Sequence, residues 1–303
     1  MEKLHIAINT KTKVITQLEK KFEITYYKEQ TFLEKLLLKE KKYPDIYFHQ
    51  GSINTKALDI IEHSKVTIVN SNALKEQICA KRTYLKADKI FVIYPYINTQ
   101  LEYNKQLKKE FRKKYEIKKE QRLIFFTGKN LILSGVEKFF EIVHTLERDN
   151  YKIVIETNTQ EKQKIQERVK HYKLDNQTII LENYTNIDEL FIAADMFILP
   201  TKQKLFALNV LKAMYFKNAV FISSDNASSE IIDSFSLILG EKDRNTPFKI
   251  DALLGNKKEL KKIQKENYQV VKNLKFNTYM EELEYIISDN FLTESASTRV
   301  VQD

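Results

Sequence analysis

Short runs of β-branched and aromatic residues alternate with helix-patterned segments along most of this 303-residue chain, and this alternation constrains the fold more than any other feature. Strands that are joined through helices lie parallel, because the helix carries the chain back to the edge where the next strand begins. Parallel sheets of this kind are covered by helices on both faces. The sequence therefore predicts an α/β protein.

The candidate strands fall into two series. Five lie at 4–9, 22–27, 45–49, 65–70 and 89–93, and six lie at 122–127, 152–156, 178–181, 196–199, 219–223 and 236–239. Helical patterns lie at 29–42, 54–63, 72–83, 134–149, 160–173, 186–194, 205–216, 227–233, 257–274 and 277–288. Two series predict two doubly wound domains, and ligands in such sheets bind beyond the carboxyl ends of the strands.

We expect a first domain at 1–98, a basic linker helix at 99–120, a second domain at 121–290 and a loose tail at 291–303. The linker is crowded with positive charges, namely Lys105, Lys108, Lys109, Arg112, Lys113, Lys114, Lys118 and Lys119. A solvated helix that leads into the second domain explains this charge more simply than a dedicated binding patch does.

The net charge of +9 favours anionic partners without choosing among nucleic acid, phospholipid and phosphorylated substrates. Nucleic acid is a poor candidate, because the basic linker offers only Phe111 and Tyr115 for base stacking. The segment 31–43 is a basic amphipathic pattern. It fits a crossover helix that covers a sheet, and it also fits peripheral contact with an anionic membrane.

Several chemistries lack their sequence signals. The single cysteine, Cys79, excludes an internal disulfide, and no Cys/His cluster has zinc spacing. No Gly-x-Ser-x-Gly elbow, Walker phosphate loop or Gly-x-Gly-x-x-Gly motif is present. No signal peptide and no long apolar span is present either. We therefore expect a location in the cytoplasm, or at the inner face of the membrane.

Three ordered blocks carry a family resemblance. The first is VNSNALKEQI at 69–78 with KADKIFVIYPYINT at 86–99, and the second runs from LIFFTGK at 123–129 to Gly135 and Val136. The third comprises NIDELFIAADMFILP at 186–200, FALNVLKAM at 206–214, AVFISS at 219–224 and EII at 230–232. Together they resemble glycosyltransferase family 4 and its GT-B relatives.

The resemblance implies a GT-B fold, in which two Rossmann-like domains face a cleft. It implies an acceptor-side N-terminal domain, a donor-nucleotide domain at the C-terminus and retaining sugar transfer that needs no metal or other cofactor. It places donor binding at Gly128, Lys129, Ser134, Lys204, Leu205, Phe206, Ala207, Leu208 and Lys212. The expected partners are a nucleotide sugar and a glycan or lipid-linked acceptor.

The donor positions depart from the family pattern. Lys204 and Lys212 stand where the family has two glutamates that contact the donor sugar and the ribose diol, and Ala207 replaces a glycine. Lys129 and Ser134 stand where the family has an arginine and a lysine that neutralise the diphosphate. A lysine only donates hydrogen bonds, and two Glu→Lys changes shift the local charge by about four units. Such a site should still attract phosphate but hold ribose less well.

His49 ends a predicted strand in PDIYFHQGS at 44–52, which is similar to the family's D-x-x-H-x-H strand. The resemblance implies a catalytic histidine that makes a polar contact to a sugar. A structural histidine remains the alternative.

Three functions are compatible with these features. The first is a retaining transferase that moves a sugar from a nucleoside-diphosphate donor to a cell-surface glycan or lipid intermediate. The second is a degenerate, non-catalytic GT-B protein that acts as partner or scaffold of an active enzyme, and the altered glutamate positions motivate it directly. The third is a basic surface protein, which rests on charge alone.

Overall fold

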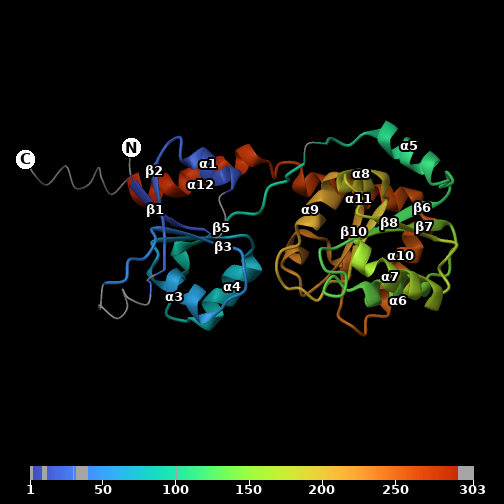
Figure 1. Cartoon of the computed structure of the whole chain (residues 1–303), viewed down its shortest axis with the longest axis horizontal. Coiled ribbons are helices and arrows are strands. Elements are labelled where there is room, and N and C mark those ends of the chain that lie inside the picture. Colours follow the sequence, from blue (N-terminus) through green and yellow to red (C-terminus); the bar gives the residue numbers. More distant parts are fainter. Residues whose placement is uncertain (1–2, 9–11, 30, 32–39, 100, 293–303) are drawn as a thin grey trace, which may run out of the picture. The chain divides into compact units, whose positions relative to one another are not determined.

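The computed structural model describes residues 3–8, 12–29, 31, 40–99 and 101–292 (Figure 1). It divides into two compact units. Unit 1 consists of Met1–Pro95 with Phe276–Asp303, and unit 2 consists of Tyr96–Lys275. Each unit has its own parallel sheet with helices on both faces, as the alternation predicts. In the described part of the chain, no helix is long and apolar enough to cross a membrane.

Unit 1 has a five-stranded parallel sheet with the order β2-β1-β3-β4-β5. Its strands are β1 (Lys3–Ala7), β2 (Glu23–Tyr26), β3 (Ile46–His49), β4 (Val66–Val69) and β5 (Ile90–Val92). Figure 1 shows α1 (Lys13–Leu18) and α12 (Phe276–Ile287) on one face of this sheet, and α3 (Thr55–His63) and α4 (Asn72–Lys81) on the other. All four residues of β4 are buried, as expected for a strand covered on both faces.

Unit 2 has a six-stranded parallel sheet with the order β11-β10-β9-β6-β7-β8. Its strands are β6 (Arg122–Phe126), β7 (Tyr151–Thr157), β8 (Thr178–Glu182), β9 (Met196–Leu199), β10 (Ala219–Ser223) and β11 (Leu237–Ile238). Its α-helices are α5 (Lys105–Lys114), α6 (Val136–His144), α7 (Thr159–His171), α8 (Ile187–Ala193), α9 (Leu208–Tyr215), α10 (Asn245–Gly255) and α11 (Lys257–Val271). The core is aromatic, with the ring centroids of Phe125 and Phe191 4.9 Å apart in an edge-on contact.

All eleven predicted strands are present, whereas some helix predictions differ from the structure. The sequence patterns did not indicate α1 or α10, and 227–233 forms a short 3-10 helix, η2 (Ala227–Ile231). The Asn226 side chain accepts a hydrogen bond from Ser228 N at the start of η2. The pattern at 29–42 falls mostly on 30 and 32–39, which lie outside the described residues, and so does most of the amphipathic segment 31–43.

The predicted linker helix is part of unit 2. Helix α5 packs on α8, and its Phe111 is buried. The Asp195 carboxylate accepts from Lys108 Nζ at 2.7 Å, from Arg112 Nη1 at 3.2 Å and from Leu123 N at 2.9 Å. These cations hold the pKa of Asp195 below its usual value although the carboxylate is buried. The prediction of a solvated linker was therefore wrong for this face of the helix, because two of its cations neutralise a buried carboxylate.

The second domain does not extend to residue 290 as predicted. Helix α12 belongs to unit 1, where Glu284 accepts from Lys21 Nζ at 2.6 Å and Lys13 Nζ lies 4.2 Å from the centre of the Phe276 ring. The sequence shows an amphipathic helix here, but such a pattern does not say which sheet its apolar face covers. Most of the predicted tail, from 293 onward, lies outside the described residues.

Asp195→Asn should lower the free energy of unfolding of unit 2 by about 2–4 kcal/mol, because it leaves Lys108 and Arg112 without their buried counter-charge. Urea denaturation followed by circular dichroism measures this change. Lys109→Ala, at an exposed position on the same helix, is the control and should change stability by less than about 0.5 kcal/mol. An Asp195→Asn protein as stable as the wild type would contradict the assignment.

Candidate functional site

Each sheet has one point at which the strand order reverses. In unit 1 this point lies between β1 and β3, and in unit 2 it lies between β6 and β9. The loops after two such strands run to opposite faces of the sheet, which leaves a crevice at their carboxyl ends. His49 ends β3, and the predicted donor-binding residues follow β6 and β9. The sequence-predicted residues thus lie at the switch points, each in its own unit.

The loops after β6 and β9 lie against each other. The carbonyl of Leu133 accepts from Thr201 Oγ1 and from Lys202 N, both at 3.0 Å. Gly135 has a φ of +83°, and a Cβ there would lie 1.8 Å from the carbonyl oxygen of Pro200. Only glycine accommodates both the left-handed backbone and this close approach. The two loops therefore form one continuous surface at the carboxyl edge of unit 2.

Ser134 lies inside this surface. It is 7% exposed, and a Cβ added to Gly128 would lie 1.9 Å from the Ser134 hydroxyl oxygen. Gly128 thus makes room for the serine side chain. Ser134 supports the loop from within, whereas the family's lysine would carry a charge at this position.

The loop before α9 presents backbone donors at the same edge. Ala207 is the N-cap of α9 and has no side chain that could satisfy the first N–H groups of the helix. Uncapped N–H groups and the helix dipole attract anions. Phe206 is buried beneath the loop, whereas Leu205 and Leu208 are exposed. The first N–H groups of α9 therefore have no side-chain cap within the predicted donor segment 205–208.

A buried asparagine fixes the shape of this loop. Asn226 Nδ2 donates to the carbonyls of Gln203 and Leu205, both at 2.7 Å, and Ala227 N donates to the carbonyl of Lys204 at 2.9 Å. Sequence reasoning missed Asn226, since a single polar residue after a strand gives no signal of its own. The Asn226 amide and the Ala227 N–H together fix three successive carbonyls, two of which belong to the predicted donor-site residues Lys204 and Leu205.

The three lysines predicted for the donor site differ in their environments. Lys129 and Lys204 are exposed, and neither forms an ion pair with a carboxylate in the described part of the chain. The Lys212 Nζ atom instead lies 2.7 Å from Asp188 Oδ1, and Thr99 Oγ1 donates a hydrogen bond to Asp188 Oδ2 at 2.5 Å. Asp188 is 9% exposed. The positive charge of Lys212 is therefore compensated, whereas Lys129 and Lys204 are exposed and have no carboxylate partner among the described residues.

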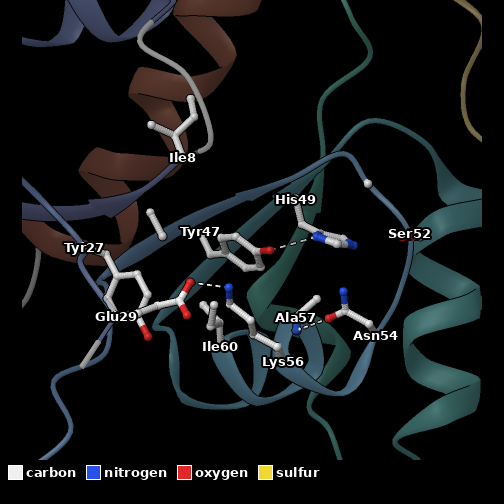
Figure 2. Close-up of a pocket in the computed structure, with 12 residues that line it drawn as sticks. Ile8, Tyr27, Glu29, Tyr47, His49, Ser52, Asn54, Lys56, Ala57 and Ile60 are labelled. Atoms are coloured by element: carbon white, nitrogen blue, oxygen red, sulfur yellow. Dashed lines mark hydrogen bonds and ion pairs between the residues drawn. The ribbon is translucent and has the colours of Figure 1, made fainter. Parts of the chain in front are cut away.

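His49 lines a cavity of about 310 Å³ in unit 1, together with Ala7, Ile8, Tyr27, Glu29, Tyr47, Gly51, Ser52, Asn54, Lys56, Ala57 and Ile60. Figure 2 shows the Tyr47 hydroxyl directed at the His49 ring, with a distance of 3.0 Å to Nδ1. Glu29 forms an ion pair with Lys56 beside Tyr27. The structure thus surrounds the predicted histidine with polar groups, of which sequence reasoning had identified none.

His49 is uncharged at neutral pH. Its side chain is 4% exposed, and burial lowers its pKa. Burial also raises the pKa of Tyr47, with a smaller contribution from Tyr27, so the Tyr47 hydroxyl keeps its proton. His49 Nε2 is buried and has no hydrogen-bond partner among the described residues. A neutral imidazole with an unsatisfied nitrogen can bind a ligand oxygen, but it offers no positive charge.

Among residues 3–8, 12–29, 31, 40–99 and 101–292, no group of three or more His, Cys, Asp or Glu side chains is arranged to hold a metal ion.

Comparison with known proteins points to one family. The model of the family described as Glycosyl transferases group 1 matches residues 108–271. The chain is 26% identical over 192 residues to "Uncharacterized glycosyltransferase MJ1607" of Methanocaldococcus jannaschii, over 60% of this chain and 49% of that protein. The chain thus spans about half the length of this curated relative.

Solved structures share the fold. WaaG, a glycosyltransferase involved in lipopolysaccharide biosynthesis, aligns over 94% of this chain and 99% of its own with a TM-score of 0.68 and 12% identity. HepE of Anabaena, solved in complex with UDP, aligns over 95% of this chain and 100% of its own, with a TM-score of 0.73 and 10% identity. A glycosyltransferase from Rickettsia africae aligns over 94% of this chain and 89% of its own, with a TM-score of 0.69 and 15% identity. The GT-B fold predicted from the sequence is confirmed.

Lys212→Ala should lower the free energy of unfolding by about 1–3 kcal/mol, because Asp188 loses a charged partner in a mostly buried site. In a double-mutant cycle with Asp188→Asn, the two changes should not add, and the coupling energy should reach at least about 1 kcal/mol. Chemical denaturation measures all four proteins. Lys204→Ala, at an exposed lysine of the preceding loop, is the matched control, and additive effects at 188 and 212 would contradict the pairing.

His49 should make the stability of unit 1 depend on pH. Its pKa is lower in the folded than in the unfolded chain, so the unfolded chain binds the proton first as the pH falls. The contribution of His49 to stability is therefore fully present above its pKa in the unfolded chain, near 6.5, and is lost progressively as the pH falls below that value. We expect the melting temperature of the wild type to fall more steeply than that of His49→Gln between about pH 7 and about pH 5. Parallel pH profiles of the wild type and His49→Gln would contradict the burial of a neutral His49.

Proposed function

The chain belongs to the family of glycosyl transferases group 1, and we propose that it is a retaining transferase that moves a sugar from a nucleoside-diphosphate donor to a cell-surface glycan or lipid-linked intermediate. The observation that carries this proposal is the carboxyl edge of unit 2. There, an uncapped helix terminus and the unpaired cations Lys129 and Lys204 share a surface formed by two hydrogen-bonded loops.

The carboxyl edge of unit 2 has the positively charged groups and backbone donors that sugar transfer would require around the donor diphosphate. When the bond between sugar and diphosphate breaks, negative charge grows on the leaving phosphate. Lys129, Lys204 and the first N–H groups of α9 would stabilise that charge. The hydrogen bonds of Asn226 hold the loop carbonyls away from the anion, so little reorganisation is needed during the reaction.

The neighbouring structures are consistent with a nucleotide donor. HepE has been solved with UDP, with UDP-glucose, and with UDP and glucose. We extend this ligand class to the present chain as part of the proposal. Because lysines and the helix terminus would meet the charge of the diphosphate, we expect turnover to persist in the presence of EDTA.

The acceptor would bind in unit 1, beside His49. The cavity lies at the carboxyl ends of β1 and β3, which is where an open parallel sheet binds its ligand. A lipid-linked acceptor would bring the protein to the inner face of the membrane, whereas a soluble glycan would leave it in the cytoplasm.

A second candidate is a non-catalytic relative that assists an active enzyme. Two observations favour it. Lys212 is committed to Asp188, and Ser134 is buried, so neither offers the group that the family uses toward the donor. A protein of this kind would show no turnover with any nucleotide sugar, and its exposed lysines could be replaced without effect on partner binding.

Lys129→Ala and Lys204→Ala should each lower kcat/KM, by about 1–3 kcal/mol in transition-state stabilisation, because each removes a charge-assisted contact to the diphosphate. Donor hydrolysis and transfer, measured across a panel of nucleotide sugars, give these values. Restoring glutamate at Lys204 and Lys212 should not raise activity, since a carboxylate at 212 would face Asp188.

Lys170→Ala provides the matched control, because it removes the same charge from an exposed position at the far end of α7. It should leave kcat/KM unchanged. Turnover that survives both Lys129→Ala and Lys204→Ala would contradict the assigned donor site. A complete absence of turnover in the wild type would favour the non-catalytic candidate.

A further inference from the structure

A groove of about 730 Å³ lies in unit 2, between helix α11 and the two 3-10 turns η2 and η3 (Ser234–Ser236). The chain passes through these turns between β10 and β11, the last two strands at one side of the sheet. None of the described residues that line the groove belongs to the predicted donor site. The proposed transfer reaction therefore does not use this groove.

The floor of the groove is apolar and accessible to water. Its apolar side chains are those of Ile231, Ile232, Phe235, Ile263 and Val270. Phe235 is 38% exposed and Val270 is 51% exposed. Apolar side chains that line one hollow, unlike apolar side chains scattered over a surface, are typical of a binding surface, because a ligand that covers them removes apolar area from water.

The rim of the groove is acidic. Glu230, Asp233, Glu259 and Glu266 contribute four carboxylates, and Lys262 contributes the one ammonium group among the described lining residues. Lys262 Nζ lies 3.2 Å from Glu259 Oε1, and this hydrogen bond, with the charges of Glu259, Glu266 and Asp233, raises the pKa of Lys262. The excess of carboxylates contrasts with the net charge of +9 of the whole chain. The groove therefore attracts a cationic ligand and repels an anionic one.

Helix α11 places its charges on different faces. Residues at the spacing of one helix face line the groove, namely Glu259, Lys262, Ile263, Glu266 and Val270. The other lysines of the helix are exposed and lie outside the groove lining, namely Lys257, Lys258, Lys261 and Lys265. From Glu259 to Val270 the groove face extends about 17 Å, or about three turns of helix.

The combination of floor, rim and length selects one class of ligand. A nucleotide, a phosphorylated sugar or an anionic membrane would face an excess of carboxylates. A small polyamine would satisfy the charge but leave the apolar floor exposed to water. A helix with apolar side chains along one face, and lysine or arginine side chains beside them, satisfies both requirements over about three turns.

We propose that this groove binds a basic amphipathic helix of a partner protein, with the apolar face of that helix on Phe235 and Val270 and its cationic side chains paired with Glu266 and Asp233. The proposal goes beyond the proposed function and does not depend on it. An active transferase and a non-catalytic relative could each bind a partner through this surface, because the donor-site residues have no part in it.

Synthetic peptides of about 14 residues, long enough for the groove face of α11, test the class of ligand. A lysine/leucine peptide carries leucines at the spacing of one helix face. Three peptides vary one property each: glutamates replace the lysines, serines replace the leucines, or the lysine/leucine sequence is scrambled. Fluorescence anisotropy with the full-length chain measures each dissociation constant, and spermidine is the competitor. We expect the lysine/leucine peptide to bind most tightly and added salt to weaken it.

Two variants of the groove test the location of the peptide. Glu266→Lys reverses a charge of the rim, and we expect it to weaken the lysine/leucine peptide roughly tenfold. Val270→Asp adds a carboxylate but removes apolar surface, and we expect it to weaken the same peptide by a similar factor. An attraction by charge alone would instead become stronger in Val270→Asp.

Glu167→Lys is the matched control for charge. It makes the same reversal at an exposed position of α7, the helix that precedes β8 at the opposite side of the sheet, and it should leave peptide binding unchanged. Thermal melting establishes that all three variants are folded.

The proposal is supported if the lysine/leucine peptide binds most tightly and both groove variants weaken it. Equal binding of the serine or scrambled peptide, or displacement by spermidine, would show a site for polycations and not for a helix. Binding of the glutamate peptide at least as tight as that of the lysine/leucine peptide would remove the role of the acidic rim. No binding of the lysine/leucine peptide, or binding that neither groove variant changes, would overturn the proposal.

Discussion

Parallel pairing at the two strand-order reversals is the constraint on which the rest of the structure depends. Because β1 pairs with β3 and β6 pairs with β9, the loops that leave these strands diverge at the carboxyl edge of each sheet. A crevice at these positions requires no further insertion or unusual loop. The polar residues of the candidate site, from His49 to Lys204, follow these strands directly. Their location is therefore a consequence of strand order.

Some positively charged side chains of this protein pair with a carboxylate inside unit 2, and others remain exposed. Lys108 and Arg112 neutralise the buried Asp195 and attach α5 to unit 2, and Lys212 neutralises Asp188. These cations contribute to the fold and are not available to a ligand. Lys129, which follows β6, and Lys204, in the loop before α9, remain exposed and form no ion pair among the described residues. The net charge by itself thus says little about partners, because only the uncompensated cations attract them.

The candidate sites of the two units, each taken by itself, differ in chemistry. The edge of unit 2 is cationic and rich in backbone donors, which suits a leaving diphosphate. Among the described residues that line the cavity of unit 1, the two charged side chains are Glu29 and Lys56, and they pair with each other. A transferase needs both properties, because its donor is an anion whereas an ordinary sugar acceptor is not. This division of chemistry between the units is consistent with the function proposed from the family.

The sequence by itself determined the strands, the class of fold and the loops that carry the candidate site. Strand prediction succeeded because buried parallel strands are short apolar runs, which need no knowledge of distant residues. The order of the motifs along the chain also placed His49, Lys129 and Lys204 at or after the ends of strands, where the structure has them. The ordered third block, at 186–232, was the strongest part of that signal.

Only the tertiary structure decided which groups meet. An amphipathic pattern shows that α12 has an apolar face, but not that this face covers the sheet of unit 1. Lysines look alike in a sequence, and folding alone separates Lys212, which Asp188 neutralises, from Lys204, which remains exposed. Likewise, Tyr47 became a partner of His49 because alternate residues of a strand share one face of the sheet and their side chains meet there. Charge compensation and hydrogen-bond partners depend on distances of a few ångströms between residues far apart in the chain, and the local sequence does not contain them.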